Sequence, residues 1–321
     1  MALDSAAPFD VMVLGSAFVE LTPAQSGCAI TEAADFVALP AGAAANFALS
    51  LAALGPRVAF LGRVGDDELG RWLAGCLRAH GINADLLRPV PGQLTPLTVC
   101  WADGLGRKTF YFYRFPGFSD PMATFSVADV DPVEILSARL FDFTEASLRS
   151  QPLREAALHA ARLARDAGRT VCYAVNYRPD SWREGLAEIR ALQQQAVAAA
   201  DLVLMNRDEA QFLFATTDPR AASLRAAELG PTAVVVTGGD APVLVACGGE
   251  VIEVPIYAVP VQYDVGAGDT FHAGFIAGYL RGLPPPEAAR WGAAAAALKI
   301  SHPASAPPPT AAEVAEFVAS G

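Results

Sequence analysis

The sequence predicts an α/β fold, in which helices flank a doubly wound and mostly parallel β-sheet. Apolar runs such as Phe9 to Leu14 and Ala233 to Val236 have the length and flanks of buried strands. Helical windows such as Ser150 to Gly168 separate these runs, and such alternation is typical of parallel sheets. With no internal repeat and no long linker, the chain is expected to form one domain over residues 8–319.

Composition excludes several classes of protein. Of the 321 residues, 53% are hydrophobic and 18% are charged, which argues against disorder. The net charge of −11 offers no basic surface for a phosphate backbone, so we expect no nucleic-acid partner. The start of the chain lacks signal-peptide form, and the Ala-rich run 293–300 is too short to span a bilayer. We therefore expect a cytoplasmic protein with no membrane partner.

The sulfur and imidazole side chains follow no metal-binding pattern. The odd number of cysteines and the lack of C-x-x-C spacing favour buried thiols in a reducing compartment, and the four histidines lack metal-ligand spacing. The cysteines are Cys28, Cys76, Cys100, Cys172 and Cys247. We assign no chemistry to any histidine.

The most informative stretch runs from Asp264 to Phe275. It follows a β-rich segment, Val251 to Tyr263, and becomes helical from Asp269. Three small residues between them let the backbone turn and expose its N–H groups, namely Gly266, Ala267 and Gly268. Free N–H groups at the positive end of a helix bind anions.

A carboxylate beside an anion site suits transfer of a phosphoryl group to an alcohol, because Asp269 could take the hydroxyl proton. A helix-capping aspartate is an equally simple reading. The two lysines, Lys108 and Lys299, do not follow glycine, so the chain has no P-loop. If the chain is a phosphotransferase, amides, hydroxyls, magnesium or arginine must hold the phosphates.

The segment Asp264-Val-Gly-Ala-Gly-Asp-Thr-Phe271 resembles the C-terminal signature of the ribokinase-like (PfkB) carbohydrate kinases. The resemblance extends over nearly the whole chain and implies a ribokinase-like fold with a small β-sheet lid. It implies that Asp269 is the catalytic base and that the amides of Gly266, Ala267 and Gly268 form an anion hole. It also implies ATP and Mg²⁺ as cofactors, and it leaves a monovalent cation near this loop open.

Several residues of the first half match the family around the sugar. The resemblance places Glu20 against sugar hydroxyls, although a solvated charge on an edge strand is the alternative. Pro40 to Phe47 precedes a helix and resembles the N-terminal signature, which puts Gly42 and Asn46 at the sugar; Ala41 replaces the usual first glycine. For Asn46 the alternative is a helix cap.

Lid strands are expected within about 16–40 and 95–116. Thr95 to Ala102 and Arg107 to Tyr113 read as a hairpin around Asp103 to Gly106. The aromatic residues near Tyr113 suit a lid or an interface, and the resemblance implies a homodimer formed through it. Arg114 beside them could clamp a carboxylate or lie at the rim.

A strand at Val171 to Val175 leads into Asn176-Tyr-Arg-Pro-Asp-Ser-Trp182. This pattern resembles the sugar-acid branch of the family, notably the 2-keto-3-deoxygluconate kinases, with 5-dehydro-2-deoxygluconate kinases carrying a close variant. By this resemblance Arg178 and Arg114 grip a substrate carboxylate. A salt bridge at the sheet edge is the alternative for Arg178. Asn176 is assigned to the ATP side.

The second half carries the expected nucleotide side. Asn206 and Glu209, after a strand at 202–205, match the family motif that organises magnesium through waters and positions phosphates; an N-cap is the alternative. Thr237 and Gly239 match a turn that contacts ATP. Pro242 and Gly292 replace a glycine and an asparagine that are common in the family. Helices are expected at 287–300 and 310–318, with Thr310 as a cap.

The sequence therefore predicts an ATP-dependent kinase that phosphorylates a primary hydroxyl of a sugar or sugar acid, with 2-keto-3-deoxygluconate as the favoured acceptor. Alternatives of the same fold are a fructokinase, a ribokinase, a 5-dehydro-2-deoxygluconokinase or a nucleoside kinase. A non-catalytic sugar- or nucleotide-binding regulator is the alternative of another class. An oxidoreductase is disfavoured, because no G-x-G-x-x-G follows the first strand.

Overall fold

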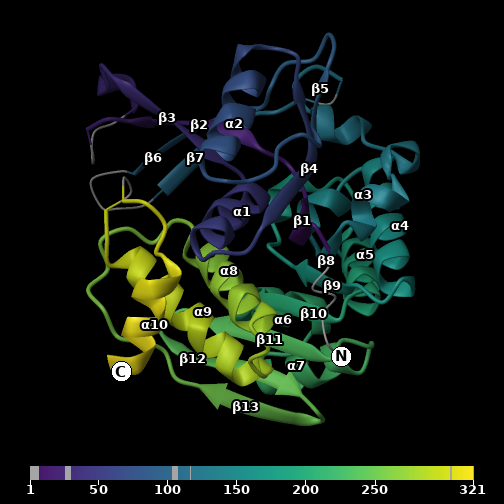
Figure 1. The fold of residues 1–321 in the computed structure, drawn as a ribbon, viewed down its shortest axis with the longest axis vertical. Helices are drawn as coiled ribbons and strands as arrows, with labels where there is room; N and C mark the ends of the chain where they lie inside the picture. The colour runs from purple at the N-terminus through teal and green to yellow at the C-terminus, as the bar shows by residue number, and fades with distance from the viewer. Residues whose placement is uncertain (1–6, 26–29, 103–107, 116, 304–305, 321) are drawn as a thin grey trace.

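The computed structural model describes residues 7–320, except 26–29, 103–107, 116 and 304–305 (Figure 1). Thirteen strands occur in the described part of the chain. They are β1 (Phe9–Leu14), β2 (Phe18–Pro23), β3 (Phe36–Ala41), β4 (Val58–Gly65), β5 (Leu87–Val90), β6 (Leu97–Ala102), β7 (Lys108–Tyr113), β8 (Ala138–Thr144), β9 (Thr170–Ala174), β10 (Leu202–Asn206), β11 (Ala233–Gly238), β12 (Ala241–Cys247) and β13 (Glu250–Val254).

Ten α-helices connect or follow these strands in the described residues. They are α1 (Ala43–Ala53), α2 (Glu68–Ala79), α3 (Pro132–Leu136), α4 (Leu153–Asp166), α5 (Leu186–Ala199), α6 (Arg207–Phe214), α7 (Pro219–Ala227), α8 (Ala267–Leu280), α9 (Pro285–Ile300) and α10 (Ala311–Ser320). None of the helices described is both long and apolar enough to cross a lipid bilayer.

A nine-stranded sheet forms the centre of the molecule, in the order β13-β12-β11-β10-β9-β8-β1-β4-β5. Neighbouring strands from β5 to β11 run parallel, and β11, β12 and β13 are antiparallel. The expected doubly wound, mostly parallel sheet is confirmed. Its parallel strands are nearly uniformly apolar because both faces are buried.

Helices cover both faces of this sheet (Figure 1). One hydrophobic core gathers side chains of α1, α2, α8, α9 and α10, and the other gathers those of α3 to α7. Helix α8 is buried along most of its length because α1 and α9 pack against it. A Cβ added at Gly274 would lie 2.8 Å from the Cα of Gly292 on α9, so the two helices approach closely through glycine.

Strands β3, β2, β6 and β7 form a separate small sheet, drawn at the upper left of Figure 1. The expected hairpin pairing of β6 with β7 is present, from Leu97 opposite Tyr113 to Ala102 opposite Lys108. Its turn, predicted at Asp103 to Gly106, lies outside the described residues. Strands β2 and β6 pair in parallel, which joins two segments far apart in sequence.

Two expectations about local structure are wrong. The β-rich segment Val251 to Tyr263 is a strand only as far as Val254. Beyond it, prolines interrupt the segment, and the N–H groups of Gln262 and Tyr263 donate to the carbonyl of Ile300 at the end of α9. Helix α8 begins at Ala267, two residues before the expected start.

Candidate active site

Helices α1 and α8 pack against each other, and their first turns meet beside the loop that follows β9 (Figure 1). Asp269, in the first turn of α8, accepts a hydrogen bond at Oδ2 from Nδ2 of Asn46 on α1, at 3.0 Å. Beside this contact, the hydroxyls of Ser50 and Thr270 lie 3.3 Å apart. Two polar contacts therefore fix the position of Asp269 relative to α1.

A second amide reaches the same carboxylate from the loop after β9. Nδ2 of Asn176 donates to Oδ1 of Asp269 at 3.4 Å. The backbone of Asn176 has φ 38°, a left-handed conformation that asparagine adopts more readily than most residues. The turn after β9 thus aims this amide at the carboxylate.

Asp269 is partly exposed, but enough protein surrounds its carboxyl group to shift its pKa. Burial raises the pKa of Asp269 from its usual range, while the hydrogen bond from Asn46 and the charges of His272 and Arg178 lower it. A carboxylate of raised pKa that is still held by donors is a suitable proton acceptor near neutral pH.

The first turn of α8 is open to a ligand. Its N-cap, Gly266, has a left-handed φ of 79°, and a Cβ at Gly266 or Gly268 would meet no atom within 4 Å. The amides of Gly268 and Asp269 have no acceptor within the helix, because first-turn N–H groups never do. Asp269 therefore lies in an open first turn whose N–H groups are available to a ligand.

Gly42, the N-cap of α1, needs to be glycine. It has φ 113°, and a Cβ there would lie 2.6 Å from the carbonyl oxygen of Ser16. Only glycine fits, both in conformation and in space. Ala41, where the family more often has glycine, is the last residue of β3.

The loop from Asn176 to Trp182 is anchored at several points. The N–H of Tyr177 donates to Oε1 of Glu209 at 2.9 Å, and its ring stacks on Phe212. Nε1 of Trp182 donates to the buried carboxylate of Glu145. Arg178, between these anchors, is exposed, and within the described contacts its guanidinium reaches only the Tyr177 carbonyl, at 3.3 Å.

Asn206 and Glu209 form a reciprocal helix cap at the start of α6. Oδ1 of Asn206 accepts from the N–H of Glu209 at 2.9 Å, and Oε2 of Glu209 accepts from the N–H of Asn206 at 2.8 Å. Burial raises the pKa of Glu209 to about 7. Both of its oxygens already accept N–H groups, so the remaining lone pairs suit a water on magnesium better than a bidentate metal bond.

The turn after β11 lies next to this cap, because Asn206 on β10 pairs with Thr237 on β11. Gly239, with φ 69°, begins the tight turn from β11 to β12. Pro242 lies in β12 before its pairing with β13 starts at Val243, so its missing N–H breaks no bond to β13.

Sequence reasoning overlooked Arg207. A Cβ at Gly238 would lie 2.7 Å from Nε of Arg207, so the guanidinium lies directly across this glycine. Arg207 is exposed, and no described carboxylate pairs with it. The sequence could have indicated Arg207, because it directly follows Asn206 and therefore lies beside the end of the neighbouring strand β11.

The small sheet carries the other predicted residues. Glu20 on β2 is buried, and its charge helps to raise the pKa of Tyr263, after burial. Tyr113 on β7 is 51% exposed. Arg114 pairs with Asp120 at 2.7 Å and donates to Oγ of Ser16 at 3.0 Å. Its charge is thus already compensated within the protein, in contrast to that of Arg178.

Gly292 has a structural explanation. A Cβ at this position would lie 2.8 Å from the carbonyl oxygen of Phe271 on α8. A larger side chain would force α9 away from α8. The asparagine common in the family is therefore incompatible with the α8–α9 contact of this chain.

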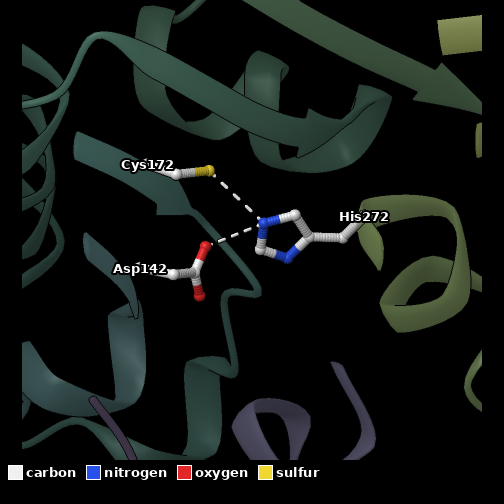
Figure 2. Close-up of side chains that lie close together, drawn as sticks. All are labelled: Asp142, Cys172 and His272. Carbon is white, nitrogen blue, oxygen red and sulfur yellow. Dashed lines mark hydrogen bonds and ion pairs between the residues drawn. The ribbon is translucent and has the colours of Figure 1, made fainter. Parts of the chain in front are cut away.

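Beneath the first turns of α8 lies a buried cluster that the sequence did not reveal (Figure 2). Nε2 of His272 lies 2.9 Å from Oδ2 of Asp142 on β8 and 3.3 Å from Sγ of Cys172 on β9. The imidazole also stacks on Phe47 of α1, with ring centroids 3.9 Å apart. The cluster connects α8 to the middle of the large sheet.

Comparisons with known proteins agree with this arrangement. The model of the pfkB family carbohydrate kinases matches residues 9–311. A 5-dehydro-2-deoxygluconokinase from Photobacterium profundum is 30% identical over 311 residues, which are 94% of this chain and 92% of that protein.

Solved structures give the same picture. The PfkB protein from Polaromonas sp. JS666 is 28% identical with a TM-score of 0.86, over 96% of this chain and 99% of that one. Fructokinase from Vibrio cholerae O395, in its form with bound fructose, ADP and calcium ion, is 27% identical with a TM-score of 0.83, over 97% of this chain and 99% of that one. Together with the site, these matches show that the chain has the ribokinase-like fold and belongs to the pfkB family of carbohydrate kinases, as an ATP-dependent sugar kinase.

Proposed function

We propose that this kinase phosphorylates a primary hydroxyl of a sugar acid of the 2-keto-3-deoxygluconate type. The observation that carries the proposal is Arg178, an exposed guanidinium beside Asp269 without a described carboxylate partner. A guanidinium recognises a carboxylate through paired, charge-assisted hydrogen bonds. The 5-dehydro-2-deoxygluconokinase relative acts, by its name, on another sugar acid.

Asp269 accepts the proton of the acceptor hydroxyl as its oxygen attacks the γ-phosphoryl group in line. Asn46 and Asn176 hold the two carboxylate oxygens, which orients the free lone pairs. The amides of Gly266, Ala267, Gly268 and Asp269 surround the charge that develops on the transferred group. Glu20, Gly42, Asn46, Tyr113 and Arg178 contact the acceptor in this proposal, and Arg114 holds the lid against Ser16.

ATP lies along the edge formed by the ends of β9, β10 and β11. Asn206 keeps its side-chain N–H₂ for a phosphate, because its Oδ1 is used in the cap. Arg207 adds a cation beside Gly238, and Asn176, Thr237 and Gly239 complete the edge. Magnesium would be held through waters by Glu209 and Asn206, and it supplies charge neutralisation between the phosphates.

A neutral hexose is the second candidate, and one observation favours it. Asp120 compensates Arg114 at 2.7 Å, so only one of the two predicted carboxylate-binding arginines is available. The fructokinase from Vibrio cholerae, among the similar structures, has bound fructose.

We also propose that two copies associate through the small sheet. Strand β7 exposes large aromatic side chains on both faces of this sheet, and such patches mark protein contacts. On β7 the most exposed are Phe112, at 58%, and Tyr111, at 56%. Sedimentation velocity would find a dimer in the native protein and a monomer after Phe112→Ser with Tyr111→Ser. A native monomer at micromolar concentration contradicts this proposal.

The acceptor is tested by measuring ADP formation with 2-keto-3-deoxygluconate, 5-dehydro-2-deoxygluconate, fructose, ribose and adenosine. We expect Arg178→Gln to raise KM for the sugar acid by about 10- to 100-fold, the worth of a charged hydrogen bond, and to leave fructose unaffected. Arg183→Gln, also exposed and in the same loop, is the matched control. Turnover of neutral sugars alone would contradict the sugar-acid proposal.

A further inference from the structure

A carboxylate lies in the middle of an apolar row of the large sheet. Asp142 on β8 pairs with Val13 on β1 and with Cys172 on β9, and Cys172 pairs in turn with Leu202. Asp142 is completely buried. An isolated charge at such a place is strongly unfavourable, so the side chain needs a compensating partner.

His272 is that partner. Its Nε2 lies 2.9 Å from Oδ2 of Asp142, a contact that the dashed line in Figure 2 marks. Cys172 contributes no charge, because burial and then the Asp142 charge raise the pKa of its thiol well above the usual value. Asp142 and His272 therefore compensate each other.

The pair is directly coupled to Asp269. His272 follows Asp269 by three residues on α8, so the two side chains are neighbours on the helix surface. Consecutive residues of α1 contact both, since Asn46 donates to Asp269 and Phe47 stacks on His272. A displacement or loss of charge at His272 is thus transmitted to Asp269 over one helical turn.

We propose that the buried Asp142–His272 pair is a positioning element for Asp269, anchoring the start of α8 to the sheet and placing the His272 charge one turn below the reacting carboxylate. This inference rests on the proposed role of Asp269 as the base. It explains why an ion pair occupies a site where apolar residues would pack without a desolvation cost.

The groups that face Asp269 and His272 determine whether loss of the His272 charge raises or lowers the pKa of Asp269. Arg178 faces Asp269 from the loop after β9, and Asp142 and Cys172 face His272 from the sheet. The contacts of α1 and α9 with this part of α8 come from uncharged residues. The positive charge of His272 lowers the pKa of Asp269, so its removal raises that pKa and moves the acidic limb of the rate profile to higher pH.

The test is the pH dependence of kcat/KM, measured with the acceptor that the native enzyme phosphorylates fastest. Asp142→Val with His272→Phe replaces the pair by apolar residues and preserves packing. We expect a melting temperature near that of the native enzyme and an acidic limb shifted upward by roughly 0.5 to 1 pH unit. Asp142→Asn with His272→Gln serves as a second variant, because it removes the same two charges with polar side chains, and it should shift the limb in the same direction.

Ser50→Ala is the control, because it removes a contact between α1 and α8 without changing charge, and its limb should not move. A folded double variant whose rate falls equally at every pH, with the limb in place, would overturn the proposal. So would stoichiometric zinc in the native enzyme that is lost on Cys172→Ala, since the cluster would then be a metal site. Failure of the sugar-acid proposal is scored separately, by the acceptor panel.

Discussion

The large sheet and the small sheet hold their candidate site residues in different ways. At the end of the large sheet, Asp269 is bound by two amides, and the loop with Asn176 is anchored through Tyr177 and Trp182. On the small sheet, Tyr111 and Phe112 are 56% and 58% exposed, and Phe112 touches Phe18 edge to face. The site at the end of the large sheet is therefore preorganised, whereas the small sheet exposes apolar surface to solvent.

This difference separates chemistry from substrate choice. Phosphoryl transfer depends on fixed positions of a base and of N–H donors, and in our proposal Asp269 and the first turn of α8 provide them. A lid can instead gain contacts on closing, when it excludes water and completes the site. We therefore expect substitutions of Asp269 and of the amides that bind it to impair every acceptor alike, and substitutions at the small sheet or at Arg178 to alter acceptor affinity.

The largest effect is expected for Asp269→Asn. Asparagine keeps the shape but accepts no proton, so kcat should fall by about 100- to 10,000-fold on all acceptors. Steady-state ADP release with each acceptor measures it, and ATP affinity from fluorescence titration serves as the control for folding. Retention of more than about a tenth of kcat would contradict a role as base.

Arg207→Gln should raise KM for ATP by about tenfold or more, because a charged hydrogen bond to a phosphate is lost. KM for the sugar should not change, since Arg207 lies at Gly238 and away from the small sheet. Arg220→Gln is the matched control, as Arg220 pairs with Glu253 at 2.6 Å on the surface. Equal KM values for ATP in the two variants would contradict the assignment of Arg207 to the nucleotide site.

Glu20→Gln tests the small sheet, where we expect a change in KM for the sugar and not in KM for ATP. Loss of a charged acceptor for sugar hydroxyls should raise KM for the sugar by about tenfold and leave KM for ATP unchanged. Both constants come from one matrix of sugar and ATP concentrations. A change in KM for ATP of the same size would show that the two regions are not separable.

The smallest effect concerns Glu209 and stability. Its pKa is about 7 in the folded protein, against 4.5 ordinarily, so the folded state binds its proton more tightly than the unfolded state does. This contribution is complete below about pH 4.5 and is lost as the pH rises through 7. The melting temperature of Glu209→Gln should therefore fall less between about pH 5 and pH 8 than that of the native protein, by a few degrees. Melting temperatures that change equally with pH in the two proteins would contradict the raised pKa of Glu209.

Much of the fold followed from local patterns. Strand β1 has the predicted bounds, and Thr310 accepts from the N–H of Glu313 as the predicted cap of α10. The segment after β13 was misjudged because its apolar and β-branched residues pack on α9 rather than in the sheet. Local propensity cannot reveal which surface an extended segment will contact.

For the site, the motif located Asp269 but not its surroundings. The two asparagines that bind it lie 223 and 93 residues away in sequence, and spacing gives no information on such pairs. His272 was passed over because its partners, Asp142 and Cys172, come from two different strands. Arg178 and Arg114 look equivalent in sequence, and only Asp120 distinguishes them.

The bond between Asn46 and Asp269 also has a consequence for biosynthesis. Because α1 is made early and α8 late, a ribosome must complete most of the polypeptide before the two can meet. In the proposed mechanism, a nascent chain still lacking α8 has no proton acceptor. The proposed base and the amide that orients it therefore come together only when α8 docks beside α1.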